Sequence, residues 1–137
     1  MAPSFHDEAL AVLATKKNLR AVELPVFRSG AGFDFKRVRG GLLVQDRDTE
    51  SEERDQMTVV TKAQPTEGQW GDLLFAWRVA KHVKSNAIVF ARDLATIGVG
   101  AGQMSRVDST RLATEKAGIA GLDTTGCAVA SDAFFPF

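Results

Sequence analysis

Polar side chains able to do chemistry occur in two short runs, one on each side of a strongly apolar segment. They carry ammonium, imidazole, hydroxyl, amide and guanidinium groups, and belong to Lys81, His82, Lys84, Ser85, Asn86, Gln103, Ser105 and Arg106. A strand of about 5–6 residues that joins two polar corners is a common way for an α/β fold to present a ligand site. The segment therefore predicts binding groups at both ends of a buried strand.

Each group has more than one possible role. Lys81 and His82 could form a general acid–base pair, because a histidine titrates near neutral pH; alternatively, both complement the C-terminus of a helix. Ser85 and Asn86 suit either a turn or an amide aimed at a ligand. Arg106 lies near a predicted helix start, where the helix dipole disfavours a cation, so it indicates a ligand or an ion pair.

Three glycines precede that helix, at Gly98, Gly100 and Gly102. The dinucleotide-binding pattern G-x-G-x-x-G fails because Gln103 stands at its last position, which argues against a Rossmann oxidoreductase. The P-loop pattern fails because no Gly-Lys-Ser/Thr follows. The glycines permit close approach of either a ligand or a neighbouring element, and both interpretations stay open.

Composition limits the class of protein. The chain has 137 residues, enough for one domain over 1–137, with 45% hydrophobic and 25% charged residues. Its formal net charge of +0 favours neither nucleic acid nor an anionic membrane as a partner. Cys127 is the single cysteine, so an internal disulfide and a cysteine-cluster zinc site are excluded. With no apolar run near ~20 residues and no signal-peptide pattern, the expected location is cytoplasmic.

Periodicity predicts the elements that must position these groups. Helices are expected over 5–17, opened by a capping box at Ser4, over 65–83 and over 105–116. Strands are expected over 21–24, 33–36, 42–44, 58–61, 87–91, 96–100 and 127–130, with a hairpin or an extended excursion near Gly40 and a solvated charged loop over 46–55. Strands and helices alternate in the second half, which predicts an α/β class and a three-layer αβα sandwich.

The helix over 65–83 places a large apolar stripe on one face, consisting of Trp70, Leu73, Leu74, Trp77 and Ala80. We predict that this face is mostly buried, in the chain or at a subunit interface. Truncating Trp77 to alanine should then cost ~3–5 kcal/mol.

Longer runs resemble a known family, the AICAR transformylase part of the bifunctional purine biosynthesis enzymes. They cover 81–91, 98–109 and 130–137, with further similarity over 40–46 and 72–77. The resemblance implies a transferase of purine biosynthesis that moves a formyl group from 10-formyltetrahydrofolate to AICAR. It implies a cytoplasmic homodimer that is a multifunctional enzyme, with a hydrolase activity (IMP cyclohydrolase) in another domain. It also implies a cytidine deaminase-like fold with a mixed sheet, but without zinc, because one cysteine cannot supply the deaminase ligands.

The resemblance further implies roles for individual residues. Substrate contacts fall at Asn86, Arg106, Phe134 and Pro136, and Val107 lies beside the folate. Secondary candidates are Lys81, His82, Ser85, Gln103 and Asp132. The family's catalytic lysine–histidine pair belongs to an upstream Lys-His-x-Asn-Pro-Cys-Gly block without a counterpart here, so Lys81 and His82 are not assigned to it.

The matching part is smaller than the family's enzyme, which leads to three expectations. The chain is a fragment of a longer protein, it lacks the cyclohydrolase domain, and it is inactive alone. The alternative function is a non-catalytic dimerisation or ligand-binding unit. In either case, a strand over 96–100 that returns antiparallel to 87–91 should bring Asn86 and Arg106 to one shared pocket.

Overall fold

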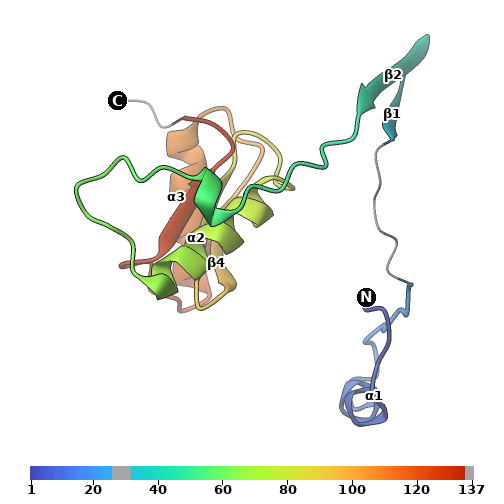
Figure 1. Cartoon of the computed structure of the whole chain (residues 1–137). Helices are drawn as coiled ribbons and strands as arrows, with labels where there is room; N and C mark the ends of the chain where they lie inside the picture. Colours follow the sequence, from blue (N-terminus) through green and yellow to red (C-terminus); the bar gives the residue numbers. More distant parts are fainter. Residues whose placement is uncertain (26–31, 135–137) are drawn as a thin grey trace. The chain divides into compact units, whose positions relative to one another are not determined.

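The computed structural model describes residues 1–25 and 32–134. Figure 1 shows the course of the chain through its helices and strands. The chain divides into two compact units, Met1–Glu50 and Ser51–Phe137.

The first unit begins with a short helix, α1 (Asp7–Ala14). Its N-cap is His6, whose side chain makes no capping hydrogen bond, so the capping box predicted from Ser4 is wrong. In a capping box, Ser4 itself would be the N-cap and would accept from the residue three positions later. The helix begins two residues further along, so Ser4 does not occupy the N-cap position. The strand predicted over 21–24 is also wrong, because Glu23 forms only an isolated parallel bridge with Ala2.

The predicted hairpin is confirmed. Strand β1 (Phe33–Val38) pairs antiparallel with β2 (Gly41–Asp46). Gly40 has a φ of +82°, a left-handed conformation that glycine adopts without steric cost. Every residue of both strands is exposed.

The second unit is built on a three-stranded sheet in the order β4-β3-β5. The central strand β3 (Ile88–Arg92) pairs antiparallel with β4 (Ala95–Gly100) and with β5 (Ala128–Ser131). The predicted antiparallel return is thus confirmed. The predicted mixed sheet is wrong for the part of the chain described, since every named strand pair is antiparallel. A tight turn joins β3 to β4, and α3 (Arg106–Ile119) connects β4 to β5, which run parallel to each other but are separated in the sheet by β3.

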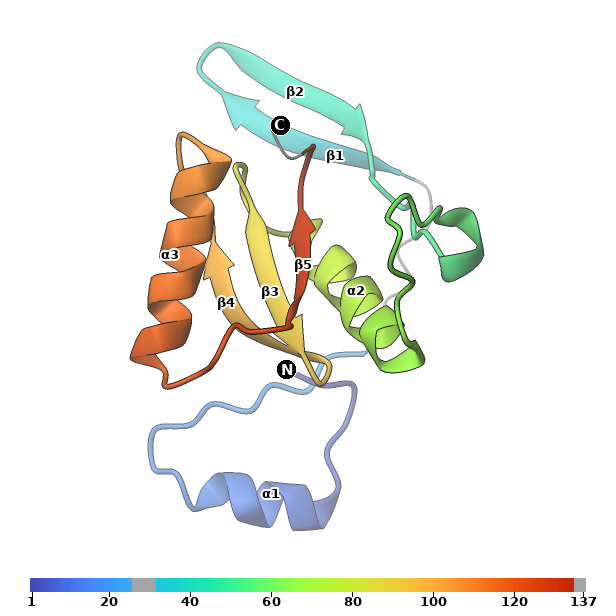
Figure 2. The same ribbon diagram turned by 90° about the vertical axis from the view of Figure 1, so that its left-hand side faces the viewer.

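Helices cover both faces of this sheet, as Figure 2 shows, with α2 (Glu67–Ala80) on one side and α3 (Arg106–Ile119) on the other. Alternate residues of a strand point to opposite faces. One face therefore packs Val89, Ala91 and Ala130 against Ala76 and Ala80 of α2. The other packs Ile88 and Phe90 against Ala113 of α3. The α/β class and the αβα layering are confirmed for this unit.

Two glycines of β4 allow α3 to lie close to the sheet. A Cβ at Gly98 would stand 2.3 Å from the carbonyl oxygen of Ala113, and one at Gly100 would stand 1.8 Å from that of Ser109. Both distances are far below van der Waals contact. Packing against α3 therefore requires glycine at these two positions, which resolves the choice left open by the sequence.

Burial of the predicted apolar face of α2 within the chain is confirmed only in part. Ala80 is buried and Trp70, Leu73 and Leu74 are half-buried, whereas Trp77 is 41% exposed. Ala76, which lies outside the predicted stripe, is also buried. Burial of this face at a subunit interface stays a prediction. Small side chains let the helix approach the sheet, and the larger aromatic side chain lies to one side. The indole N–H of Trp77 donates a hydrogen bond to Glu52 at 2.9 Å.

Other boundaries also differ from the predictions. Residues 58–61 do not form a strand, because no ladder pairs with them among the described residues. The charged loop contains a short 3-10 helix, η1 (Arg54–Gln56). Helix α3 continues past Gly118 to Ile119, and the left-handed Gly121 (φ +71°) follows its end. Within the described ranges, no helix has the length and apolar character needed to cross a membrane.

Candidate functional site

Polar groups from three elements meet at one end of the sheet in the second unit. The start of β3, the end of β5 and the start of α3 contribute them. We call this cluster the Asp132 corner, and define it as Ser85, Asn86, Arg106, Ser109, Ser131 and Asp132. It joins the two polar runs of the sequence and adds a third segment from the C-terminal part of the chain.

Asp132 holds the corner together. Its carboxylate accepts hydrogen bonds from the hydroxyl of Ser85 and from the backbone N–H of Ala87, the latter at 2.9 Å. Nη2 of Arg106 lies 3.6 Å from the same carboxylate, and both side chains are only 18% exposed. The hydrogen bond from Ser85 lowers the pKa of Asp132 most, followed by that from Ala87, and the charge of Arg106 adds to them although burial opposes the change. The side chain is therefore an ionised acceptor at neutral pH.

Arg106 is held from three directions. Besides the ion pair with Asp132, its Nε donates to the hydroxyl of Ser131 at 3.2 Å. The guanidinium lies over the ring of Phe134, 5.5 Å from the ring centroid, within the range of a cation–π contact. The prediction that a cation at this helix start would have an ion-pair partner or a ligand is confirmed by the ion pair.

Asn86 is tied to the loop before α3. Its Nδ2 donates to the backbone carbonyl of Gln103 at 2.8 Å, and its own backbone N–H donates to the same oxygen at 3.3 Å. The carbonyl of Asn86 accepts a hydrogen bond of 2.7 Å from Ser109, a wholly buried residue of α3. These bonds bring Asn86 and Arg106 to one end of the sheet. A pocket shared by the two side chains stays a prediction.

The remaining sequence candidates lie elsewhere. Lys81 is the C-cap residue of α2, His82 follows it, and both are exposed. This position agrees with the interpretation in which they complement the helix C-terminus. Val107 lies in the first turn of α3 and is 51% exposed. Pro136 lies outside the described residues.

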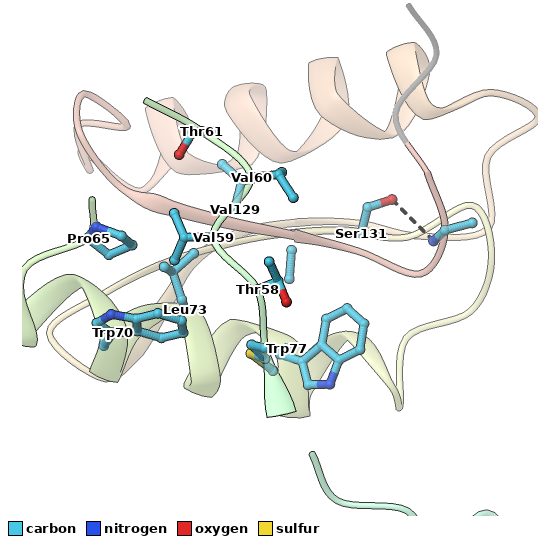
Figure 3. Close-up of a pocket in the computed structure, with 13 residues that line it drawn as sticks. Thr58, Val59, Val60, Thr61, Pro65, Trp70, Leu73, Trp77, Val129 and Ser131 are labelled. Atoms are coloured by element: carbon cyan, nitrogen blue, oxygen red, sulfur yellow. Dashed lines mark hydrogen bonds between the residues drawn. The ribbon is translucent and has the colours of Figure 1, made fainter. Parts of the chain in front are cut away.

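A pocket of about 360 Å³ opens beside the corner (Figure 3). Segment 57–61, α2 and β5 line it, and its apolar wall includes Val59, Trp70, Leu73, Trp77 and Val129. None of the described residues that line this pocket is ionisable, so their side chains suit an apolar or flat group and offer none for proton transfer. Ser131 belongs to both the pocket wall and the corner.

Two residues of the corner escaped the sequence analysis. Ser109 lies on the buried stripe of α3 that also contains Ala113 and Ala117. The sequence signal that could have identified Ser109 is a small polar residue on a stripe of small residues, which faces the glycines of β4. Ser131 gave no comparable signal, since its role depends on the pairing of β5 with β3. In the described ranges, no group of three or more His, Cys, Asp or Glu side chains is placed to hold a metal ion.

Comparison with known proteins identifies the family of the chain. The model of the AICARFT/IMPCHase bienzyme family matches residues 1–116. The chain is 58% identical to the bifunctional purine biosynthesis protein PurH of Neisseria gonorrhoeae and 57% identical to the PurH of Polynucleobacter asymbioticus. Each match covers 100% of this chain and 26% of the relative, so the chain spans about a quarter of the length of these proteins. The chain belongs to the AICARFT/IMPCHase bienzyme family.

Proposed function

We propose that this chain supplies part of the site at which a purine-biosynthesis enzyme transfers a formyl group from 10-formyltetrahydrofolate to AICAR. The observation that carries the proposal is the meeting of Asn86, Arg106 and Asp132 at one end of the sheet. Membership of the AICARFT/IMPCHase family supports this choice of reaction.

The reaction makes specific demands on such a site. The amine of AICAR attacks the formyl carbon, a new N–C bond forms, and the bond from that carbon to N10 of the folate breaks. The amine loses a proton, and N10 of the departing tetrahydrofolate gains one. Because the lone pair of this amine is delocalised toward the neighbouring carboxamide, the site must orient the amine and stabilise the oxyanion of the tetrahedral intermediate.

The corner offers groups suited to holding the carboxamide. Asn86 has an amide whose donor and acceptor match those of a second amide. The guanidinium of Arg106 has five N–H donors, more than its contacts with Ser131 and Asp132 require. Phe134 is 77% exposed beside Arg106 and can pack against a flat heterocycle. We assign binding and orientation to these residues and place Val107 near the folate.

Further parts of the proposal follow from the family. The parent protein acts in the cytoplasm as a homodimer, and this chain is one cytidine deaminase-like unit of its transformylase domain, over 1–137. The chain alone should not formylate AICAR, because no group of the corner is suited to accept the proton of the amine. Formylation by the purified chain at a rate near that of a full-length relative would contradict this statement.

The proposal can be tested in a full-length background. The 137 residues of this chain replace the matching segment of the Neisseria gonorrhoeae relative, which aligns with the whole chain. Asn86→Ala and Arg106→Ala should each lower kcat/KM for formyl transfer at least 10-fold. The IMP cyclohydrolase activity of the same chimera serves as the control for folding and should stay unchanged. Equal losses in both activities, or no loss in formyl transfer, would contradict the proposal.

A second candidate function is non-catalytic assembly. The hairpin β1–β2 carries apolar residues on an exposed face, including Phe33, Phe35, Leu42 and Val44, which are 53–61% exposed. An isolated two-stranded hairpin is marginally stable in water, so another surface must cover it. A chain that assembles with its parent protein but leaves AICAR binding unaffected by Asn86→Ala would favour this second function.

A further inference from the structure

Asp132 contacts both of the segments that carry the proposed substrate-binding side chains. Its two carboxylate oxygens face the hydroxyl of Ser85, the backbone N–H of Ala87 and the guanidinium of Arg106. The donors come from the start of β3 and from the first residue of α3, and Asp132 itself follows the last residue of β5. One carboxylate thus joins the two segments that carry the proposed substrate contacts.

We propose that Asp132 is a positioning residue, which holds Arg106 in the geometry needed to bind the carboxamide of AICAR. This inference rests on the proposed function. Asp132 acts through Arg106 and makes no contact with the reacting atoms.

The geometry favours positioning over proton transfer. The Asp132 side chain is only 18% exposed, and its carboxylate oxygens are engaged by donors from the segment just before β3 and from α3. In addition, the hydrogen bond from Ser85 lowers the pKa of Asp132, and a weakly basic carboxylate is a poor general base near neutral pH. An arginine has many rotamers, and a carboxylate partner with the neighbouring hydroxyl of Ser131 selects one of them.

The substitution Asp132→Asn separates charge from shape. An asparagine keeps an oxygen that can accept from Ala87, but it removes the negative charge that attracts Arg106. Asp123→Asn is a matched control, because Asp123 also accepts from a backbone N–H and a hydroxyl, both of Thr125, at 3.0 and 2.8 Å. Asp132→Glu restores the charge.

In the full-length chimera, Asp132→Asn should raise KM for AICAR about 10-fold with a smaller change in kcat, which corresponds to ~1.4 kcal/mol. Asp123→Asn should change KM less than about 2-fold, and Asp132→Glu should recover part of the loss. The decisive variant is the double substitution with Arg106→Ala. If Asp132 acts through Arg106, adding Asp132→Asn to that background should change KM less than about 2-fold.

Losses that multiply in the double variant would overturn the inference, since Asp132 would then act independently of Arg106.

A second readout uses the 137-residue chain itself and does not depend on enzyme activity. The Nε–H resonance of Arg106 in a ¹H–¹⁵N spectrum should shift in Asp132→Asn and stay in place in Asp123→Asn. If Arg106→Ala leaves formyl transfer intact while this resonance shifts as expected, the proposed function fails and the Asp132–Arg106 coupling stands. An unshifted resonance would overturn the coupling.

Discussion

Gly100 determines how closely α3 can approach the sheet, and Gly100→Ala tests this packing. The added Cβ would lie 1.8 Å from the carbonyl oxygen of Ser109, 2.5 Å from its carbonyl carbon and 2.7 Å from its Cα. All three are backbone atoms of α3, so no side-chain rotation can relieve the overlap. The helix must move away from β4 and take Arg106 with it.

The size of the effect follows from that geometry. Adding a methyl group to a packed core typically costs ~1–3 kcal/mol, and a clash with backbone places this substitution at or above the upper end. A loss of ~3 kcal/mol lowers Tm by ~12–24 °C in a domain of 60–100 residues, the size class of the Ser51–Phe137 unit. Thermal unfolding of the 137-residue chain, followed by circular dichroism, measures the shift.

Gly118→Ala provides the matched control on the same helix. Gly118 lies inside α3, and a Cβ there would meet nothing within 4 Å. Alanine stabilises a helix interior by ~0.5–1 kcal/mol relative to glycine, so this variant should raise Tm. A Tm for Gly100→Ala within a few degrees of the unsubstituted chain would refute the packing of β4 against α3 described above.

Three further predictions concern single side chains. Ser109→Ala should destabilise the chain by ~1–3 kcal/mol in urea unfolding, because it removes the hydroxyl that donates a part-buried hydrogen bond to the carbonyl of Asn86; an unchanged midpoint would count against that bond. Trp77→Ala should cost only ~1–2 kcal/mol, less than for a buried tryptophan, since Trp77 is 41% exposed; a loss above ~3 kcal/mol would show that another surface covers it. The lowered pKa of Asp132 stabilises the fold above the unfolded-state pKa of ~4, and this contribution is lost as pH falls through the lower folded-state value. The stability difference between the unsubstituted chain and Asp132→Asn should therefore shrink below about pH 4, and a difference that is constant down to low pH would contradict the assignment.

Local patterns predicted those parts of the fold that depend on neighbouring residues. The hairpin of β1 and β2 follows from alternation around Gly40, and the return of β4 along β3 follows from two apolar runs joined by a polar turn. Ser105 was the expected start of α3, and its side chain does cap the helix by accepting from the N–H of Asp108.

Local patterns gave wrong predictions where the structure depends on partners distant in the sequence. Apolar periodicity on α2 selected Ala80, which does pack against the sheet, but it also selected Trp77 and missed Ala76, because close approach to the sheet favours small side chains. The β-branched run over 58–61 has strand propensity, yet propensity supplies no hydrogen-bonded neighbour. These are cases in which tertiary packing overrides a local preference.

In the candidate site, too, the sequence predicted what depends on neighbouring elements and missed what depends on distant ones. The antiparallel return was sufficient to place Asn86 and Arg106 at one end of the sheet. Asp132 and Ser131 come from β5 and the residue after it, and only the pairing of β5 with β3 brings them to this corner. No periodic pattern in the sequence contains that pairing, so the residue that joins the corner could be named only as a secondary candidate.

The most direct test of the central claim is a crystal structure of the full-length chimera with AICAR bound. We predict that the carboxamide of AICAR lies within hydrogen-bonding distance, about 2.7–3.2 Å, of both the Asn86 amide and the Arg106 guanidinium. Asp132 should still contact Arg106 in that complex. AICAR bound away from these residues, or Asn86 and Arg106 pointing to opposite faces of the sheet, would contradict the account.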